Sequence, residues 1–172
     1  MQKTYNFDMV FDTIIVNRKL MNCFSHPMKK ENMLEGIGNF ASEHDDFLVI
    51  AATLLDNEVS FFVERNTGLE DKITEITLSK YAALEDADYI FIPSTINYVT
   101  LDEIFGKAKS GTYEDPHSSA TIIIRAPDDI FIKKTIEILK KQNIEYPLGI
   151  DLIFMMENGD MLAIPRLIKE VG

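Results

Sequence analysis

Histidine, cysteine and tryptophan are scarce in this sequence of 172 residues. It contains three histidines, one cysteine (Cys23) and no tryptophan. A single cysteine excludes a disulfide within the chain and is typical of a cytoplasmic protein. With so few histidines, no Ser/His/Asp or Cys/His arrangement can be picked out. The residue pattern alone therefore identifies no catalytic, cofactor-binding or metal-binding residue.

Long apolar runs are also missing. No stretch of about 18 apolar residues occurs, which excludes a transmembrane helix of ordinary length and predicts no membrane partner. The first residues, MQKTYNFDMVFD, have neither an uninterrupted apolar core nor a small-residue cleavage site. We therefore expect no secretory signal.

Positive charge is scarce as well. The chain has 17 Lys and Arg residues against 28 Asp and Glu residues, which gives a net charge of -11 at pH 7. A nucleic-acid-binding surface needs basic side chains to neutralise phosphates, so we expect no nucleic acid partner. The same balance disfavours tight binding of a polyphosphate by this chain alone, although it leaves room for a local basic pocket.

What remains is the composition of a globular domain. The chain is 46% hydrophobic and 26% charged, without repeats or a Pro/Gly/Ser linker, so we predict one domain over residues 1–172. The spacing of apolar residues predicts helices alternating with strands. The expected helices cover residues 7–24, 44–55 and 70–78, a segment opened by a capping-box pattern at Thr100, and a segment after Pro127. The expected strands cover residues 59–64, 88–92 and 120–125.

Two helices carry more detailed expectations. In residues 7–24 the apolar side chains recur every three or four positions, which predicts an amphipathic helix ended by Ser25-His26-Pro27. Ser42 is the expected N-cap of the second helix. The predicted apolar face of the first helix consists of Phe7, Val10, Phe11, Ile14, Met21 and Phe24.

The dipeptide Asn158-Gly159 predicts a β-hairpin, because a two-residue type I′ turn needs positive φ at both positions. If these two residues form the loop, Met155 faces Leu162 and Asp151 faces Arg166. Both faces of the two strands are apolar, as expected between helix layers. The predicted fold class is therefore α/β, with a mixed β-sheet covered by helices on both faces and ending in this hairpin.

The facing pair Asp151 and Arg166 has two interpretations. An ion pair at the open end of the hairpin would fix its register and satisfy both charges. Alternatively, Arg166 presents its guanidinium to a phosphate or carboxylate. Spacing alone favours the ion pair, with an N–O distance of roughly 4 Å or less.

Two further motifs are interpreted as structural. GIGNFA (residues 36–41) fits the dinucleotide fingerprint G-x-G-x-x-A, but the preceding MKKENMLE is a poor strand, so we expect a loop. His44, Asp45 and Asp46 are adjacent and point to different faces of a helix, which favours a charged helix start over a metal site.

Four segments resemble, in order, a known protein family. PLGIDLIF (residues 147–154), followed by LAIPR (residues 162–166), resembles the C-terminal signature of the PhnH family. GTYEDPHSSAT (residues 111–121), residues 54–63 and residues 11–28 are similar to upstream segments of that family. The chain departs from the family pattern in three places. Met28 and Ser119 stand where glycine is usual, and residues 126–129 stand in place of a longer Gly-Pro-Gly-Ile loop. We therefore interpret the chain as a short, divergent member.

The resemblance carries further expectations. PhnH is the H subunit of the bacterial carbon–phosphorus lyase system, so the resemblance implies assembly with subunits G, I and J and a homodimer when alone. It also implies a fold resembling that of pyridoxal phosphate-dependent transferases, with no cofactor assigned. That system attaches a phosphonate to the ribose C1′ of ATP with release of adenine. This chain would be an accessory subunit of that transferase, without catalytic residues of its own.

The matching motifs define a candidate functional or assembly surface. Its residues are Gly111, Thr112, Pro116, His117, Pro147, Gly149, Asp151, Pro165 and Arg166. Two alternatives stay open. The chain could be an independent small-molecule enzyme or binding protein for a phosphorylated ligand, using Arg166, His117 or a lysine. It could also be a stand-alone interaction module.

Overall fold

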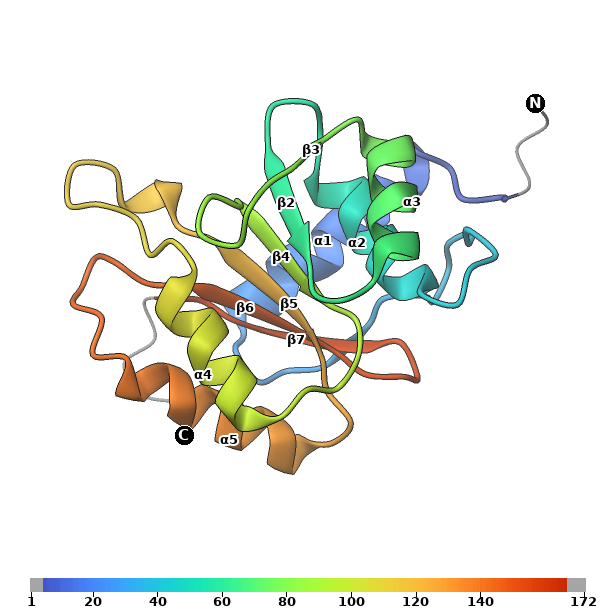
Figure 1. Cartoon of the computed structure of the whole chain (residues 1–172). Coiled ribbons are helices and arrows are strands. Elements are labelled where there is room, and N and C mark those ends of the chain that lie inside the picture. The colour runs from blue at the N-terminus through green and yellow to red at the C-terminus, as the bar shows by residue number, and fades with distance from the viewer. Residues whose placement is uncertain (1–4, 167–172) are drawn as a thin grey trace.

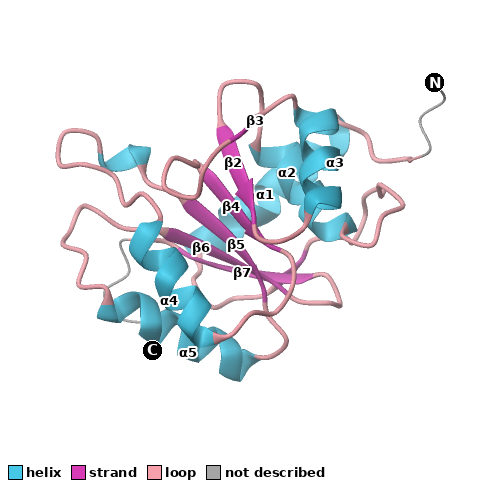
Figure 2. Cartoon of the chain, viewed as in Figure 1, coloured by secondary structure: helices cyan, strands magenta, loops and turns pink. Residues whose placement is uncertain are grey.

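The computed structural model describes residues 5–166, which form a mixed α/β fold. A central sheet lies between two layers of helices (Figures 1 and 2). The described part contains five α-helices and seven strands. The helices are α1 (Phe11–Ser25), α2 (Asp45–Leu54), α3 (Thr67–Thr77), α4 (Tyr98–Lys107) and α5 (Asp129–Lys141). The strands are β1 (Glu31–Asn32), β2 (Ser60–Val63), β3 (Lys80–Tyr81), β4 (Tyr89–Ile92), β5 (Thr121–Arg125), β6 (Asp151–Met155) and β7 (Asp160–Ile164).

The sheet is mixed, as predicted. Its strand order is β1-β7-β6-β5-β4-β2-β3. Strands β2 to β6 pair in parallel, whereas β7 is antiparallel to both of its neighbours, β6 and β1. Six strands therefore run in one direction and β7 runs against them. Within the described residues, no helix is long and apolar enough to cross a membrane.

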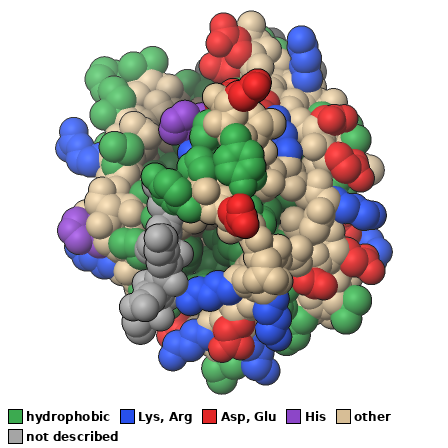
Figure 3. All heavy atoms as spheres, turned by 90° about the vertical axis from the view of Figure 1, so that its left-hand side faces the viewer, with side chains coloured by type: hydrophobic (Ala, Val, Ile, Leu, Met, Phe, Trp, Pro, Cys, Tyr) green, Lys and Arg blue, Asp and Glu red, His purple; other side chains and the backbone are tan. Residues whose placement is uncertain are grey.

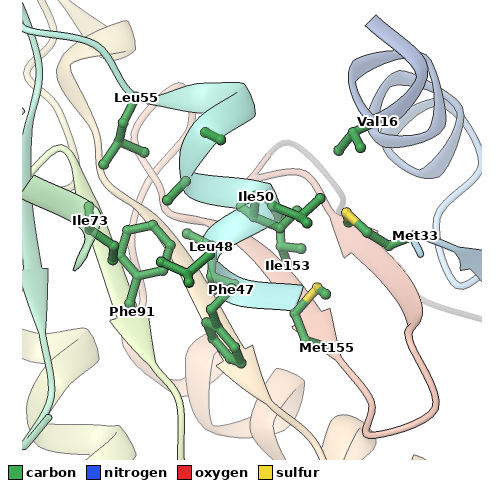
Figure 4. Packing of buried hydrophobic residues seen from close by; sticks show 14 of the residues in the cluster. Val16, Met33, Phe47, Leu48, Ile50, Leu55, Ile73, Phe91, Ile153 and Met155 are labelled. Carbon is green, nitrogen blue, oxygen red and sulfur yellow. The ribbon is translucent and has the colours of Figure 1, made fainter. Parts of the chain in front are cut away.

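Two apolar cores lie on opposite faces of this sheet. Residues 122–124 of β5 are fully buried, as the continuous apolar run predicted, and they alternate between the cores. Ile123 belongs to the core under α1, α2 and α3, and Ile122 and Ile124 belong to the core under α4 and α5. Figure 4 shows part of the first core, where Phe47 of α2 lies beside Phe91 of β4 with ring centroids 6.4 Å apart.

The β6–β7 hairpin turns at the predicted place but in a different register. Its loop has three residues, Glu157, Asn158 and Gly159, because the Met156 N–H donates to the Asp160 carbonyl at 2.9 Å. The Gly159 N–H donates back to the Met156 carbonyl at 3.1 Å, and Gly159 has φ +86°. This is the geometry of a turn followed by a glycine bulge, not of a two-residue turn.

The extra loop residue moves every pair by one position. Leu162 faces Phe154 instead of Met155, so the predicted pairing is wrong. Because side chains alternate along a strand, the shift places Leu162 in the core under α4 and α5. It also moves Arg166 away from the position opposite Asp151.

Several helix ends differ from the predictions. Helix α2 begins after His44, which makes no side-chain cap, whereas the expected cap Ser42 accepts a hydrogen bond from Lys72 Nζ at 2.9 Å. Helix α4 begins at Tyr98, and its N-cap is Asn97, three residues before the expected cap Thr100; the Asn97 side chain accepts the Thr100 N–H at 2.8 Å. Both asparagine and threonine serve as N-caps, and asparagine is the more strongly preferred of the two.

The buried face of α1 also differs from the prediction. Helix α1 ends at Ser25 as expected, but its buried residues are Val16, Leu20 and Cys23. Of the predicted face, only Phe7 is buried and Phe24 half-buried, and Phe7 precedes the helix. Four apolar residues of that face are exposed instead: Val10, Phe11, Ile14 and Met21. We call these four residues the α1 stripe.

Candidate functional site

The candidate residues from the sequence gather at one edge of the sheet. At this edge the parallel strands β4, β5 and β6 begin, and we call it the N-terminal edge. Their first residues, Tyr89, Thr121 and Asp151, are in register on neighbouring strands. Since side chains alternate, all three lie on the face that carries Ile153, toward α1 and α2.

The loop between α4 and β5 reaches this edge through a turn that needs glycine. Gly111 has φ +85°, and a Cβ there would lie 2.7 Å from the Pro116 carbonyl oxygen. The Thr112 hydroxyl accepts the Asp115 N–H at 2.9 Å and closes the turn. Pro116 then opens a short 3-10 helix, Pro116–Ser118, which carries His117.

The loop before β6 packs on the same edge. The Gly149 N–H donates to the Ser110 carbonyl at 2.9 Å, which joins this loop to the one before β5. A Cβ on Gly149 would lie 2.7 Å from Arg166 Cβ, so glycine lets Arg166 approach closely. Pro147 lies in the same loop, two residues earlier, after a cis peptide bond with Tyr146.

Arg166 and Asp151 meet at this edge, but not as the predicted ion pair. The Arg166 backbone N–H donates to Asp151 Oδ1 at 2.7 Å. Its guanidinium extends elsewhere, to Ser119 Oγ through Nη1 and to His117 Nδ1 at 2.9 Å through Nη2. Among residues 5–166, neither charged group has an ion-pair partner within 4.0 Å. The one-residue shift of the hairpin explains why the expected salt bridge is absent between these described residues.

A cavity of about 340 Å³ opens beside this cluster, and we call it the edge cavity. Its polar lining comes from Tyr89, Thr121, Asp151 and Arg166. Its apolar lining comes from Phe24, Leu54, Ile153 and Pro165. Phe24 and Leu54 belong to the last turns of α1 and α2, so the cavity lies between two helix C-termini and the sheet.

Negative charge dominates the surroundings of Tyr89. Burial raises the pKa of the Tyr89 hydroxyl above 10.0, and the charges of Asp88, Asp56 and Asp151 raise it further. Burial also opposes ionisation of Asp88, but hydrogen bonds from Lys109 and Ser60 outweigh it and hold the Asp88 pKa below 3.8. The Asp88 carboxylate is therefore already paired with the Lys109 ammonium group.

The outer surface of the N-terminal edge is rich in apolar side chains. Figure 3 looks onto this side of the molecule, from which the loops of residues 108–120 and 142–150 project. Hydrophobic side chains occupy the middle of the view, and several Lys and Arg side chains lie below them (Figure 3). The exposed aromatic residues Tyr113 and Tyr146 belong to these two loops, and the Tyr113 hydroxyl donates to Glu145 Oε2 at 2.9 Å.

A second cavity, of about 480 Å³, lies at the opposite edge, where the parallel strands end. Arg125, the last residue of β5, donates two hydrogen bonds to Asp46 of α2, at 2.6 and 3.0 Å. Both side chains are nearly buried, with 12% and 8% of their areas exposed. No sequence pattern indicates this pair, because Asp46 and Arg125 are far apart in the chain.

The neighbours of Asp46 serve separate structural roles. The Asn66 side chain donates to His44 Nε2 at 2.9 Å, and Asp45 accepts the Phe40 N–H. Within the described residues, no group of three His, Cys, Asp or Glu side chains could hold a metal ion. Residues 36–41 precede α2 as a loop and do not open the helix directly, as expected.

Comparison with known proteins identifies one family. A family model described as "Bacterial phosphonate metabolism protein (PhnH)" matches residues 6–134. This range includes the similar N-terminal segment and residues 111–121, and it ends before the signature at residues 147–166. A search of curated proteins finds no match. Because the family model covers more than half of the chain, this protein belongs to the PhnH family of bacterial phosphonate metabolism proteins.

Proposed function

We propose that this chain is an accessory, non-catalytic subunit of the bacterial carbon–phosphorus lyase system, acting in the cytoplasm. Its family membership gives it a role in phosphonate metabolism. In the proposed role, it supports transfer of a phosphonate to the ribose C1′ of ATP with release of adenine. Subunits G, I and J are its proposed partners, and a homodimer is the proposed state of the isolated chain.

The observation that carries the proposal is the gathering of the family-like motifs at the N-terminal edge. Residues 111–121 and 147–166 are separate in sequence, yet Gly149 bonds to Ser110 and Arg166 bonds to Ser119 and His117. Exposed aromatic residues, Tyr113 and Tyr146, stand beside them. Aromatic residues are enriched at protein interfaces, so this edge is the proposed assembly surface.

The proposal includes the fold relationship to pyridoxal phosphate-dependent transferases. Its support is the sheet itself, in which six strands run in one direction, β7 runs against them, and helices cover both faces. The same architecture serves many chemistries, so the relationship concerns the fold and assigns no cofactor.

Co-purification tests the assembly role. The chain is co-expressed with its cognate subunits G, I and J, and the complex is purified through a tag on subunit I. We expect this chain to be retained in a fixed ratio to the other subunits. A complex of G, I and J that forms and consistently lacks this chain would contradict the proposal.

A pair of matched variants locates the surface. Glu114→Arg reverses an exposed charge at the N-terminal edge, and Glu157→Arg makes the same change at the opposite edge. Like-charge or steric conflict at an interface costs binding, whereas an exposed site away from it tolerates the change. We expect Glu114→Arg alone to reduce retention. Equal retention of both variants would place the assembly surface elsewhere.

A further inference from the structure

The edge cavity contains a cation and an anion that do not neutralise each other. Arg166 and Asp151 both line it, yet their charged groups are more than 4.0 Å apart. Each is held by uncharged partners among the described residues. Opposite charges fixed apart around one cavity are complementary to a ligand that carries both signs.

Arg166 supplies the positive side. An arginine has five N–H donors on its guanidinium, and here two of them go to Ser119 Oγ and His117 Nδ1. These neutral acceptors orient the group without cancelling its charge. A phosphate, phosphonate or carboxylate is the natural partner for the remaining donors, since such charge-assisted bonds are the strong ones.

Asp151 supplies the negative side. Its Oδ1 accepts the Arg166 backbone N–H, which leaves acceptor capacity for a ligand ammonium group. Two hydroxyl-bearing residues, Thr121 and Tyr89, are in register beside it on β5 and β4. They are further hydrogen-bonding groups in the lining of the cavity.

The helices add a second reason to expect a positive ligand group in this cavity. Phe24 and Leu54 line the cavity from the final turns of α1 and α2. The C-terminal end of a helix carries a partial negative charge, so both helices favour a positive group there. Neither final turn contains a basic residue that would already satisfy this field.

The cavity also has room for a short carbon chain between the two charges. Its volume of about 340 Å³ is within the range of small-molecule sites. Phe24, Leu54, Ile153 and Pro165 give it apolar walls, which suit methylene groups.

We propose that the edge cavity binds a small zwitterion. Its anionic group contacts Arg166 and its ammonium group contacts Asp151, with a short alkyl chain between them. The choice of a phosphonate as the anionic group rests on the proposed function in phosphonate metabolism, whereas the zwitterionic character rests on the cavity alone. Aminoalkylphosphonates are therefore the expected ligand class.

Isothermal titration of the full chain with matched probes tests the proposal. The probes are 2-aminoethylphosphonate, ethylphosphonate without the amine, and ethanolamine without the anion. Removing either charge loses a charged hydrogen bond, so both single-charge probes should bind at least about tenfold more weakly. No heat of binding from 2-aminoethylphosphonate at millimolar concentration, or equal binding of ethylphosphonate, would overturn it.

Two further probes separate the ligand class from the site. 2-Aminoethyl phosphate and β-alanine carry the same ammonium group with a phosphate or a carboxylate. Weaker binding of both supports the phosphonate assignment. Equal or tighter binding of either keeps the zwitterion site and overturns the phosphonate choice, which alone depends on the proposed function.

Conservative variants test whether Asp151 binds the ammonium group of the ligand and Arg166 its anionic group. Asp151→Asn keeps an oxygen for the Arg166 N–H but removes the negative charge, so it should weaken 2-aminoethylphosphonate about tenfold without weakening ethylphosphonate. Arg166→Gln should weaken 2-aminoethylphosphonate without weakening ethanolamine. Controls of the same chemistry are Asp129→Asn and Arg65→Gln, whose side chains are 62% and 86% exposed away from the cavity. Equal losses in variants and controls would overturn the assignment.

The binding test and the assembly test are independent. Titration uses the isolated chain, so failure to co-purify with subunits G, I and J does not affect it. Conversely, a chain that joins the complex but binds no probe retains the accessory role and loses the ligand site.

Discussion

At the scale of single residues, two arginines at opposite edges of the sheet are held in different ways. Arg166 donates from its guanidinium to the uncharged groups Ser119 Oγ and His117 Nδ1. Arg125, at the end of β5, donates instead to the carboxylate of Asp46 on α2. The charge of Arg125 is therefore matched inside the fold, whereas that of Arg166 is not matched by an anion among the described residues.

Met28 occupies a position where the family usually has glycine, and it keeps the backbone conformation that glycine favours. Glycine is usual at this position in the family, and Met28 adopts φ +68° here. Left-handed backbone of this kind is adopted readily by glycine and at a cost by other residues. The backbone of this turn therefore retains the shape that glycine favours, while the Met28 side chain packs against the core under α4 and α5.

The Arg125–Asp46 pair leads to a stability prediction. Asp46→Ala leaves the Arg125 guanidinium nearly buried without its anion, so we expect the free energy of unfolding to fall by about 3–5 kcal/mol. Urea denaturation measures the change. The double variant Asp46→Leu, Arg125→Met removes both charges and should recover much of the loss.

The control is the exposed pair of Lys30 and Asp129, 2.8 Å apart, whose side chains are 39% and 62% exposed. Exposed pairs contribute at most about 1 kcal/mol, so Lys30→Ala should have little effect. A loss of similar size in Asp46→Ala and Lys30→Ala would show that burial does not govern the first pair.

Cys23 gives a prediction about reactivity and pH. Burial raises the pKa of its thiol to about 11, with a further contribution from Glu31. At pH 8 the folded thiol should react with a disulfide reagent at least about a hundredfold more slowly than the unfolded one, whose pKa is ordinary. Because the raised pKa favours the neutral thiol, its share of the stability is present below pH 9.0 and is lost as pH rises toward about 11. Fast labelling of Cys23 in the native protein would contradict this.

At the scale of elements, segments with a strong apolar pattern were predictable from the sequence, and the two-residue strands were not. Strands β4 and β5 and helix α5 lie within a residue or two of their expected places, since each has a strong apolar pattern. Strands β1 and β3 have two residues each and were missed. They are strands only because β7 and β2 offer unpaired edges, which is a property of the assembled sheet.

The predicted register of the hairpin and the predicted buried face of α1 were wrong for a related reason. Asn158-Gly159 marks a turn, but its choice between a two-residue and a three-residue loop depends on how β7 packs. In α1, apolar residues occur on two sides of the helix, and the sheet buries only the side that carries Val16 and Leu20. Periodicity alone does not say which of two apolar faces is inside.

The α1 stripe therefore gives a prediction at this scale. Ile14 is 54% exposed, so Ile14→Ser should change the free energy of unfolding by about 0.5 kcal/mol or less. Leu20→Ala on the same helix removes a fully buried side chain and should cost about 2–5 kcal/mol. Urea denaturation of the two variants compares the faces directly. A cost for Ile14→Ser that approaches that of Leu20→Ala would mean that α1 is rotated.

At the scale of the whole molecule, one sheet connects the two cores and the two cavities at its opposite edges. Neighbouring residues of β5 and β6 point into opposite cores. The two cores therefore pack against the same strands, and loss of packing in one core weakens the strands that support the other. The N-terminal edge contains the edge cavity, and the opposite edge contains the Arg125–Asp46 pair. Both edges are therefore held in place by the same central strands.

The shared sheet predicts that the chain unfolds as one domain. Ile132 of α5 lies in the core under α4 and α5, whereas Cys23 of α1 lies in the other core. Ile132→Ala should cost about 2–5 kcal/mol, and in one cooperative unit that loss reaches Cys23 through the sheet. In a urea series, the midpoint for Cys23 labelling should fall by the same amount as the midpoint measured by circular dichroism. If circular dichroism shows two transitions and the Cys23 midpoint does not move, the two layers unfold separately and the single-domain prediction is wrong. Val16→Ala provides the reciprocal measurement, because it removes packing beside Cys23 and should shift both midpoints together.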